Sequence, residues 1–171
     1  MQANIFEIKT RITNPEDIHD TLMRSGAEFH GLDHQIDTYF KVDRGRLKLR
    51  QGDIENTLIR YHRPETKDLK NSKVIFQKLQ RENQGIKDIL EDVMGIWKVV
   101  DKQRRIYFIE NVKFHIDEVK GLGSFVEIEA IDISGESDNT QLRKQCDHYI
   151  EVLGLNRNQF IDQSYSDMVH T

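Results

Sequence analysis

Residues 112–130 read VKFHIDEVKGLGSFVEIEA, and this stretch decides the fold. On both sides of Gly121 and Gly123, apolar residues alternate with charged ones, which is the pattern of a strand with one apolar face. The glycines lack the strand-to-helix context of a nucleotide-binding loop, so they predict a hairpin turn. The polar face of this hairpin carries, in chain order, Lys113, His115, Asp117, Glu127 and Glu129.

The same alternation recurs along the chain. It predicts strands at 4–12, 34–41, 46–50, 57–62, 74–79, 97–100 and 104–110. Helical spacing of apolar residues predicts helices at 14–25, 84–94 and 139–153, and a short one within 162–170. Consecutive strands joined by short turns indicate an α+β protein, built on an antiparallel sheet or barrel with added helices.

Length and composition narrow the class of protein. A chain of 171 residues predicts one domain, spanning 1–171. The formal net charge of −4 argues against a generic nucleic-acid binder, which is normally basic. Cys146, the single cysteine, excludes an internal disulfide framework and indicates a thiol buried in the core. With no signal peptide or apolar run of about 20 residues in the sequence, we expect a cytoplasmic protein without a membrane partner.

The charged strand faces allow two interpretations. An antiparallel sheet with one solvated face gives this alternation without any function. Alternatively, the sheet closes into a barrel with its charges inside. Burial of an unpaired charge costs several kcal/mol, so such a lumen requires partners: Lys and Arg would bind phosphate oxygens, and carboxylates would bind Mg²⁺ or Mn²⁺. Alternation alone does not choose between the two.

Several segments, taken in order, carry a resemblance to a known family. They are EIK at 7–9, DTYF at 37–40, GRLKLR at 45–50, LIRYHRP at 58–64, KQRRIY at 102–107 and HIDEVKGLGSFVEIE at 115–129. Together they resemble the CYTH superfamily, the triphosphate tunnel metalloenzymes, over residues 4–165. This superfamily includes class IV adenylate cyclases and thiamine triphosphatases. The resemblance implies a closed eight-stranded antiparallel β-barrel, or tunnel, with flanking helices.

The resemblance also implies roles for individual residues. The metal ligands for Mg²⁺ or Mn²⁺ would be Glu7, Asp117, Glu127 and Glu129. The residues that bind the triphosphate would be Lys9, Lys48, Arg50, Arg60 and Arg104, with Arg63, Lys70 and Ser72 near the mouth. Lys9, Arg104 and His115 are the candidate catalytic residues. For His115, donation to phosphate or proton transfer stands beside a purely structural role.

One position departs from the family pattern. The family begins with Glu-x-Glu-x-Lys, whereas Ile5 stands here at the first Glu, which removes one metal ligand. The resemblance favours a class IV adenylate cyclase-like enzyme that converts ATP to cyclic AMP and pyrophosphate. The alternatives are a triphosphatase acting on thiamine triphosphate, tripolyphosphate or a nucleoside triphosphate, and a non-catalytic module that binds nucleotide or polyphosphate. A homodimer is compatible with all three.

Overall fold

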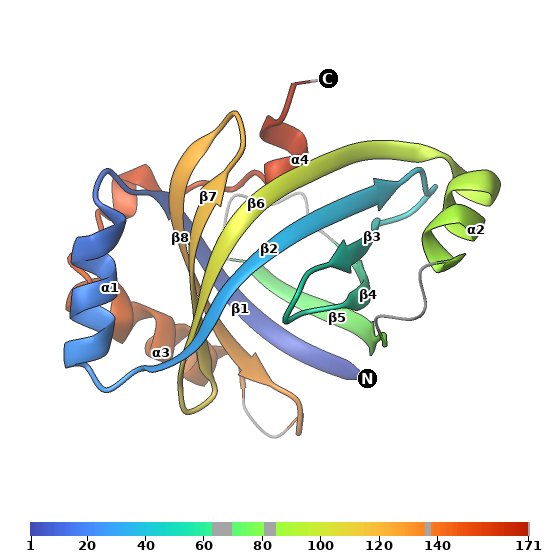
Figure 1. Ribbon diagram of the computed structural model, residues 1–171. Coiled ribbons are helices and arrows are strands. Elements are labelled where there is room, and N and C mark those ends of the chain that lie inside the picture. The colour runs from blue at the N-terminus through green and yellow to red at the C-terminus, as the bar shows by residue number, and fades with distance from the viewer. Residues whose placement is uncertain (63–69, 81–84, 136–137, 171) are drawn as a thin grey trace.

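Eight strands form a closed antiparallel β-barrel in the computed structural model, which describes residues 1–62, 70–80, 85–135 and 138–170 (Figure 1). The side chains of residues 70–72 also lie outside this description. Around the barrel the strands run β1-β5-β4-β3-β2-β6-β7-β8. Their bounds are β1 (Gln2–Arg11), β2 (Glu28–Phe40), β3 (Arg46–Gln51), β4 (Thr57–Tyr61), β5 (Lys70–Lys78), β6 (Ile96–Ile109), β7 (Val112–Val119) and β8 (Gly123–Asp132). The predicted fold class is thereby confirmed.

Helices flank the barrel and lie close to where the sequence predicts them. They are α1 (Pro15–Arg24), α2 (Gly85–Met94), α3 (Asn139–Val152) and α4 (Tyr165–Met168), with the 3₁₀ turn η1 (Arg157–Gln159). Asn14 caps α1, because its side chain accepts a hydrogen bond from the backbone N–H of Glu16. Figure 1 shows α1 and α3 together on one side of the barrel and α2 at the opposite side. Among the described residues, no helix is long and apolar enough to cross a bilayer.

The main hydrophobic core lies outside the barrel, between its wall and two helices. Leu22 of α1 and Leu142 and Cys146 of α3 pack with Phe114 and Ile128 on the outward faces of β7 and β8. Burial raises the pKa of the Cys146 thiol to about 12, which leaves it an inert core residue. Since the apolar faces of the strands point outward, the charged faces must point into the barrel.

A second, smaller core lies at the end of the barrel where β7 turns into β8. Tyr165 of α4 packs there against Tyr39, Val119 and Phe125. The chain leading to α4 is fastened to β1, since the backbone N–H of Ile161 donates to the carbonyl of Lys9 at 2.9 Å. The C-terminal segment therefore covers this end of the lumen, next to the β7–β8 hairpin (Figure 1).

The strand β6 differs from the prediction, which broke it into two pieces at 97–100 and 104–110. It is continuous over Ile96–Ile109. The gap between the two predicted pieces holds three consecutive polar residues, Asp101, Lys102 and Gln103, of which Lys102 is buried inside the barrel. A buried charged face cannot be distinguished from a solvated one by hydropathy alone.

Candidate active site

The register of the strands decides which side chains share the lumen, because residues that lie opposite each other point to the same side of a sheet. Glu7 lies opposite Glu129 and Lys9 opposite Glu127 across β1 and β8. Through β7, β6, β2 and β3, further pairs continue this inward ring: His115 with Glu127, Arg104 with Asp117, and Asp37 with Arg50. The lumen is thus lined by acidic and basic groups from six strands.

Three cations from two strands converge on Asp37. Its carboxylate accepts hydrogen bonds from Arg50 Nε at 2.9 Å, Lys48 Nζ at 3.1 Å and Lys102 Nζ at 2.7 Å. Burial opposes ionisation of Asp37, but Arg50, Lys102 and Lys48 outweigh it and hold its pKa well below the usual range. We call these four residues the Asp37 cluster; it has more positive than negative charge.

Within the Asp37 cluster, Lys102 is a lysine whose charged form is disfavoured by burial. Burial lowers its pKa to about 7 against the opposing effect of Asp37, with Arg104 and Arg50 lowering it further. Since three neighbouring cations share one carboxylate, an additional anion in the lumen would favour the charged form of Lys102.

A second group of ionic contacts centres on Arg104. Its guanidinium donates to both oxygens of Asp117, at 2.6 and 2.5 Å, and to Glu127 at 2.7 Å. Tyr165 Oη donates to Asp117 at 2.8 Å. Burial disfavours the charged form of Arg104, yet Asp117 and Glu127 outweigh this and raise its pKa well above the usual value. The predicted metal ligand Asp117 is therefore engaged by Arg104 and Tyr165.

Lys9 of β1 contacts both β8 and the C-terminal segment. Its ammonium lies 3.0 Å from Glu127 Oε1 and 3.8 Å from Glu7 Oε1. It also lies 4.1 Å from the centre of the Tyr165 ring. Burial disfavours its charge, but Glu127 and Glu7 more than compensate and raise its pKa. Lys9 is thus a fixed positive charge at the acidic side of the lumen.

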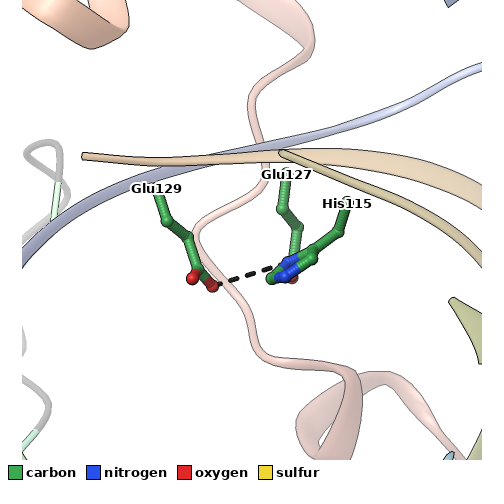
Figure 2. Close-up of side chains that lie close together, drawn as sticks. All are labelled: His115, Glu127 and Glu129. Carbon is green, nitrogen blue, oxygen red and sulfur yellow. Dashed lines mark hydrogen bonds and ion pairs between the residues drawn. The ribbon is translucent and has the colours of Figure 1, made fainter. Parts of the chain in front are cut away.

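The acidic side is formed by Glu127 and Glu129 of β8 beside His115 of β7 (Figure 2). One ring nitrogen of His115 and one oxygen from each carboxylate lie within 4.8 Å of one another. Burial raises the pKa of Glu129 to about 7; Lys113 opposes this, whereas Glu7 and Glu127 add to it. Like charges directly opposite in a sheet destabilise it, so the Glu7–Glu129 pair concentrates negative charge on the partly buried inner wall of the barrel.

These residues fit a hard divalent cation. Carboxylate oxygens are the preferred ligands of Mg²⁺ and Mn²⁺, and the surplus charge of Glu7 and Glu129 would be neutralised by such an ion. Glu127 lies beside them, although its two oxygens already accept from Lys9, Arg104 and His115. Ile5, which replaces the first Glu of the family pattern, lies opposite Ile131 and supplies no oxygen.

Asp37 and Glu55 are acidic residues of the lumen that the sequence interpretation missed. Asp37 was seen only as part of a motif, although it organises the cations around it. Glu55 follows β3 in a loop with no strand pattern, and it reaches the lumen to accept from Arg50 at 2.9 Å and from Lys113. Lys102, Lys113 and Tyr165 were likewise assigned no role. The alternation of β6 and β7 could have found the two lysines, but nothing local marks Glu55.

Arg60 is placed differently from the prediction. It lies opposite Leu47 in the β3–β4 ladder, so it shares the outward face, and its side chain is exposed. The inward residue beside it is Tyr61, opposite Arg46. Arg60 is therefore not part of the lumen. Arg63 lies outside the described residues, as do the side chains of Lys70 and Ser72, whose backbones pair with β1.

A separate pocket of about 290 Å³ lies outside the barrel wall. Its apolar lining comes from Ile36, Leu49, Leu79 and Ile86, where α2 approaches β2 and β3. Ile36 and Leu49 alternate with the inward Asp37 and Arg50, so the apolar lining of this pocket is on the opposite face of the sheet from the charged lumen, although Arg50 also borders the pocket.

A closed barrel lined by interlocked acidic and basic side chains, with excess carboxylate at one wall and excess cation at another, defines a protein of the charged-tunnel type. The sequence matches the CYTH domain over residues 4–165, and the chain belongs to that family. A curated relative from Methanocaldococcus jannaschii, named "Putative adenylate cyclase MJ0240", is 25% identical over 95% of this chain and 96% of its own.

The similarity to solved structures with the same fold extends over nearly the whole chain. The PH1012 protein of Pyrococcus horikoshii OT3 has a TM-score of 0.82 at 24% identity, over 97% of this chain and 99% of its own. A protein from Hippeastrum has a TM-score of 0.59 at 15% identity, over 96% of this chain and 93% of its own. It is described as "Putative adenylyl cyclase HpAC1" that "reveals a dominant triphophatase activity".

Proposed function

We propose that this protein is a divalent-metal-dependent enzyme that binds a triphosphate inside the barrel and cleaves one of its phosphorus–oxygen bonds. The observation that carries the proposal is the division of charge in one lumen. In the Asp37 cluster three cations converge on one carboxylate, with Arg50 shared with Glu55, while Glu7 and Glu129 lie opposite each other as like charges. A polyphosphate together with a metal ion would neutralise both.

The cations of the lumen would bind the phosphate oxygens. Lys48, Arg50 and Lys102 already point at a single carboxylate, so their side chains are oriented before substrate arrives. Arginine and lysine donate short, charge-assisted hydrogen bonds to phosphate. Phosphoryl chemistry asks the protein mainly for positioning and for neutralisation of developing charge. Held on both sides by carboxylates, Lys9 and Arg104 would supply that neutralisation at fixed positions.

The metal would be held on the acidic wall by Glu7 and Glu129, next to Glu127. A divalent ion bound there would supply neutralisation of phosphate charge and Lewis-acid polarisation of a phosphate oxygen. The neighbouring Lys9 keeps Glu127 ionised, since it lies 3.0 Å from that carboxylate and lowers its pKa.

The reaction that we place first is the cyclase reaction, because the curated relative carries that name. The 3′-hydroxyl oxygen of ATP would bond to the α-phosphorus, the bond from that phosphorus to the bridging oxygen would break, and pyrophosphate would leave. Triphosphatase activity is the second candidate, favoured by the description of the Hippeastrum protein. In that reaction a water oxygen would bond to the terminal phosphorus, and the bond from that phosphorus to the bridging oxygen would break. The diphosphate would leave, and the attacked phosphorus would become orthophosphate as the water proton passes to solvent.

The test is a product assay on the purified protein. ATP, thiamine triphosphate and tripolyphosphate are each incubated with Mg²⁺ or Mn²⁺. Cyclic AMP with pyrophosphate supports the cyclase, and orthophosphate supports the hydrolase. Unchanged ligand that binds tightly and without metal would instead identify a non-catalytic binding module, and no product across the panel overturns both enzyme assignments.

Variants test whether the lumen performs the reaction. Arg50→Ala and Glu129→Ala should each lower kcat/KM by at least about 100-fold, since each removes a group placed to bind the phosphates or the metal. Arg60→Ala is the matched control: it removes an arginine from the neighbouring strand, but from the exposed outer face. Equal losses in Arg60→Ala and Arg50→Ala would contradict the assignment to the lumen.

A further inference from the structure

The ring of His115 has one nitrogen in use and one without a partner. Its side chain is 1% exposed, and Nδ1 lies 3.1 Å from Glu127 Oε2 and 3.6 Å from Glu129 Oε1. Nε2 is buried and has no hydrogen-bond partner among the described residues. A buried polar atom left unsatisfied costs about 1–3 kcal/mol, so this nitrogen calls for an explanation.

The surroundings of Glu127 fix which nitrogen carries the proton. Glu127 accepts from Lys9 and Arg104 as well as from His115, and two cations at 3.0 and 2.7 Å keep it ionised. Facing a carboxylate, Nδ1 must be the protonated donor. Nε2 is then the unprotonated nitrogen, with its lone pair inside the charged lumen. What it lacks is therefore a donor or a cation, not an acceptor.

The carboxylates around the ring differ in how far they are already satisfied. Glu127 and Asp117 are each held by Arg104 together with at least one further donor. For Glu129, the one ion pair with the described residues is the contact to His115 at 3.6 Å. Across the β1–β8 ladder from it lies Glu7. The groups on the acidic wall that remain able to bind a metal ion are thus Glu7, Glu129 and the ring of His115.

We propose that Nε2 of His115 ligates the divalent cation held by Glu7 and Glu129, with Glu127 orienting the ring through Nδ1–H. This inference rests on the proposed function, because it takes the metal site from there. A carboxylate that accepts the second N–H of a ligating histidine is the usual support for an imidazole–metal bond. Imidazole suits transition metals better than Mg²⁺, so the site should select Mn²⁺ over Mg²⁺.

The experiment looks for the metal–nitrogen bond directly. The protein is treated with chelator, loaded with Mn²⁺ and measured by pulsed electron paramagnetic resonance, once with natural histidine and once with ¹⁵N-histidine. We expect imidazole-nitrogen modulation that changes with the isotope. It should vanish in His115→Gln and persist in His34→Gln, the matched control, whose exposed ring bonds Asp101. Titration calorimetry should show Mn²⁺ affinity reduced roughly 10- to 100-fold in His115→Gln, with Mg²⁺ affected less.

The outcomes separate this inference from the proposed function. Bound Mn²⁺ without nitrogen modulation in the wild-type protein overturns the role of His115, while triphosphate turnover in the same sample leaves the proposed function standing. Absence of both Mn²⁺ binding and turnover overturns the two together. If circular dichroism shows that His115→Gln does not fold, His115→Asn replaces it, and the wild-type spectrum alone remains decisive when it shows no nitrogen. Modulation that persists in a folded His115 variant also overturns the proposal.

Discussion

At the level of single residues, the lumen shows how a buried charge is made tolerable. Arg104 is the clearest case, since its guanidinium presents a planar set of donors and serves two carboxylates at once. A lysine at this position has a single ammonium and would not reproduce the paired contact with Asp117. The main effect of Arg104 is therefore to make the burial of Asp117 and Glu127 as ionised carboxylates tolerable.

We expect Arg104→Met to lower the free energy of unfolding by about 3–5 kcal/mol, because it leaves Asp117 and Glu127 buried without their main cation. Arg105→Met is the control. Arg105 is adjacent, but its side chain is 32% exposed and its contact is with Glu16 on the outside, so its loss should cost under about 1 kcal/mol. Urea denaturation measures both. Similar costs for the two variants would contradict the inward pairing.

Glu129 gives a pH dependence with a definite sign. Burial, with Glu7 and Glu127, raises its pKa to about 7, above the usual value of 4.5. Between these values the folded protein holds more protons than the unfolded chain, so this carboxyl group lowers stability as pH rises. In chelator, the wild-type free energy of unfolding should fall relative to that of Glu129→Gln between pH 5 and 7.5, by at most about 3 kcal/mol. A constant difference across this range would contradict the pKa.

At the level of elements, the loop after β3 is folded around one buried carboxylate. Asp33 of β2 accepts from the backbone N–H groups of Asp53, Ile54 and Glu55 at 2.6, 2.8 and 3.0 Å. Gly52 passes so close to Asp33 that a Cβ there would lie 2.6 Å from its carboxylate. This arrangement directs Glu55 into the lumen, where it occupies cations that would otherwise be available to an anion.

Glu55→Gln should therefore bind tripolyphosphate more tightly, by roughly tenfold, equivalent to about 1.4 kcal/mol. The reason is that Arg50 and Lys113 lose a competing carboxylate. Calorimetry at fixed ionic strength provides the measurement. Glu118→Gln makes the same change of charge at an exposed outward position of β7 and should leave the affinity unchanged. Weaker binding by Glu55→Gln would mean that Glu55 assists the ligand instead of competing with it.

The strands differ in how well their position and their inward residues can be predicted from the sequence. β1, β7 and β8 combine an apolar and a charged face in strict alternation, so both their existence and their inward residues follow from the sequence. In β4 the pattern is ambiguous: Arg60 and Tyr61 could each have faced inward, and the register with β3 decides for Tyr61. Glu55 enters the lumen through tertiary contacts with Asp33, which no local pattern encodes. The lumen residues that the sequence does not predict are thus those placed by strand register or by the conformation of a loop.

For the whole molecule, apolar burial and charge burial occupy different places. The larger hydrophobic core stabilises the fold from outside the barrel, while the lumen holds ionic contacts that stabilise a protein weakly at best. A ligand that neutralises the remaining charge of the lumen should therefore stabilise the folded protein. Tripolyphosphate with Mn²⁺, at about 100 times its Kd, should add about 2.7 kcal/mol to the free energy of unfolding.

That gain should be visible as a rise in Tm that shrinks as salt is added, because screening weakens charge contacts at the lumen mouth. Sulfate at the same ionic strength controls for the general effect of an anion. A Tm that tripolyphosphate and Mn²⁺ leave unchanged would show that the lumen does not bind this ligand and would remove the basis of the proposed function.

The closure of the barrel has a consequence for how the chain reaches its native state. β1 lies between β5 and β8, so its two neighbours are synthesised long after it. Until β5 emerges from the ribosome, β1 has two unpaired edges. Until β8 emerges, one edge stays open and Glu7 and Lys9 lack their opposite residues Glu129 and Glu127. Topologies of such high contact order fold in milliseconds to seconds, and the nascent protein must pass through this interval with an open sheet that invites aggregation.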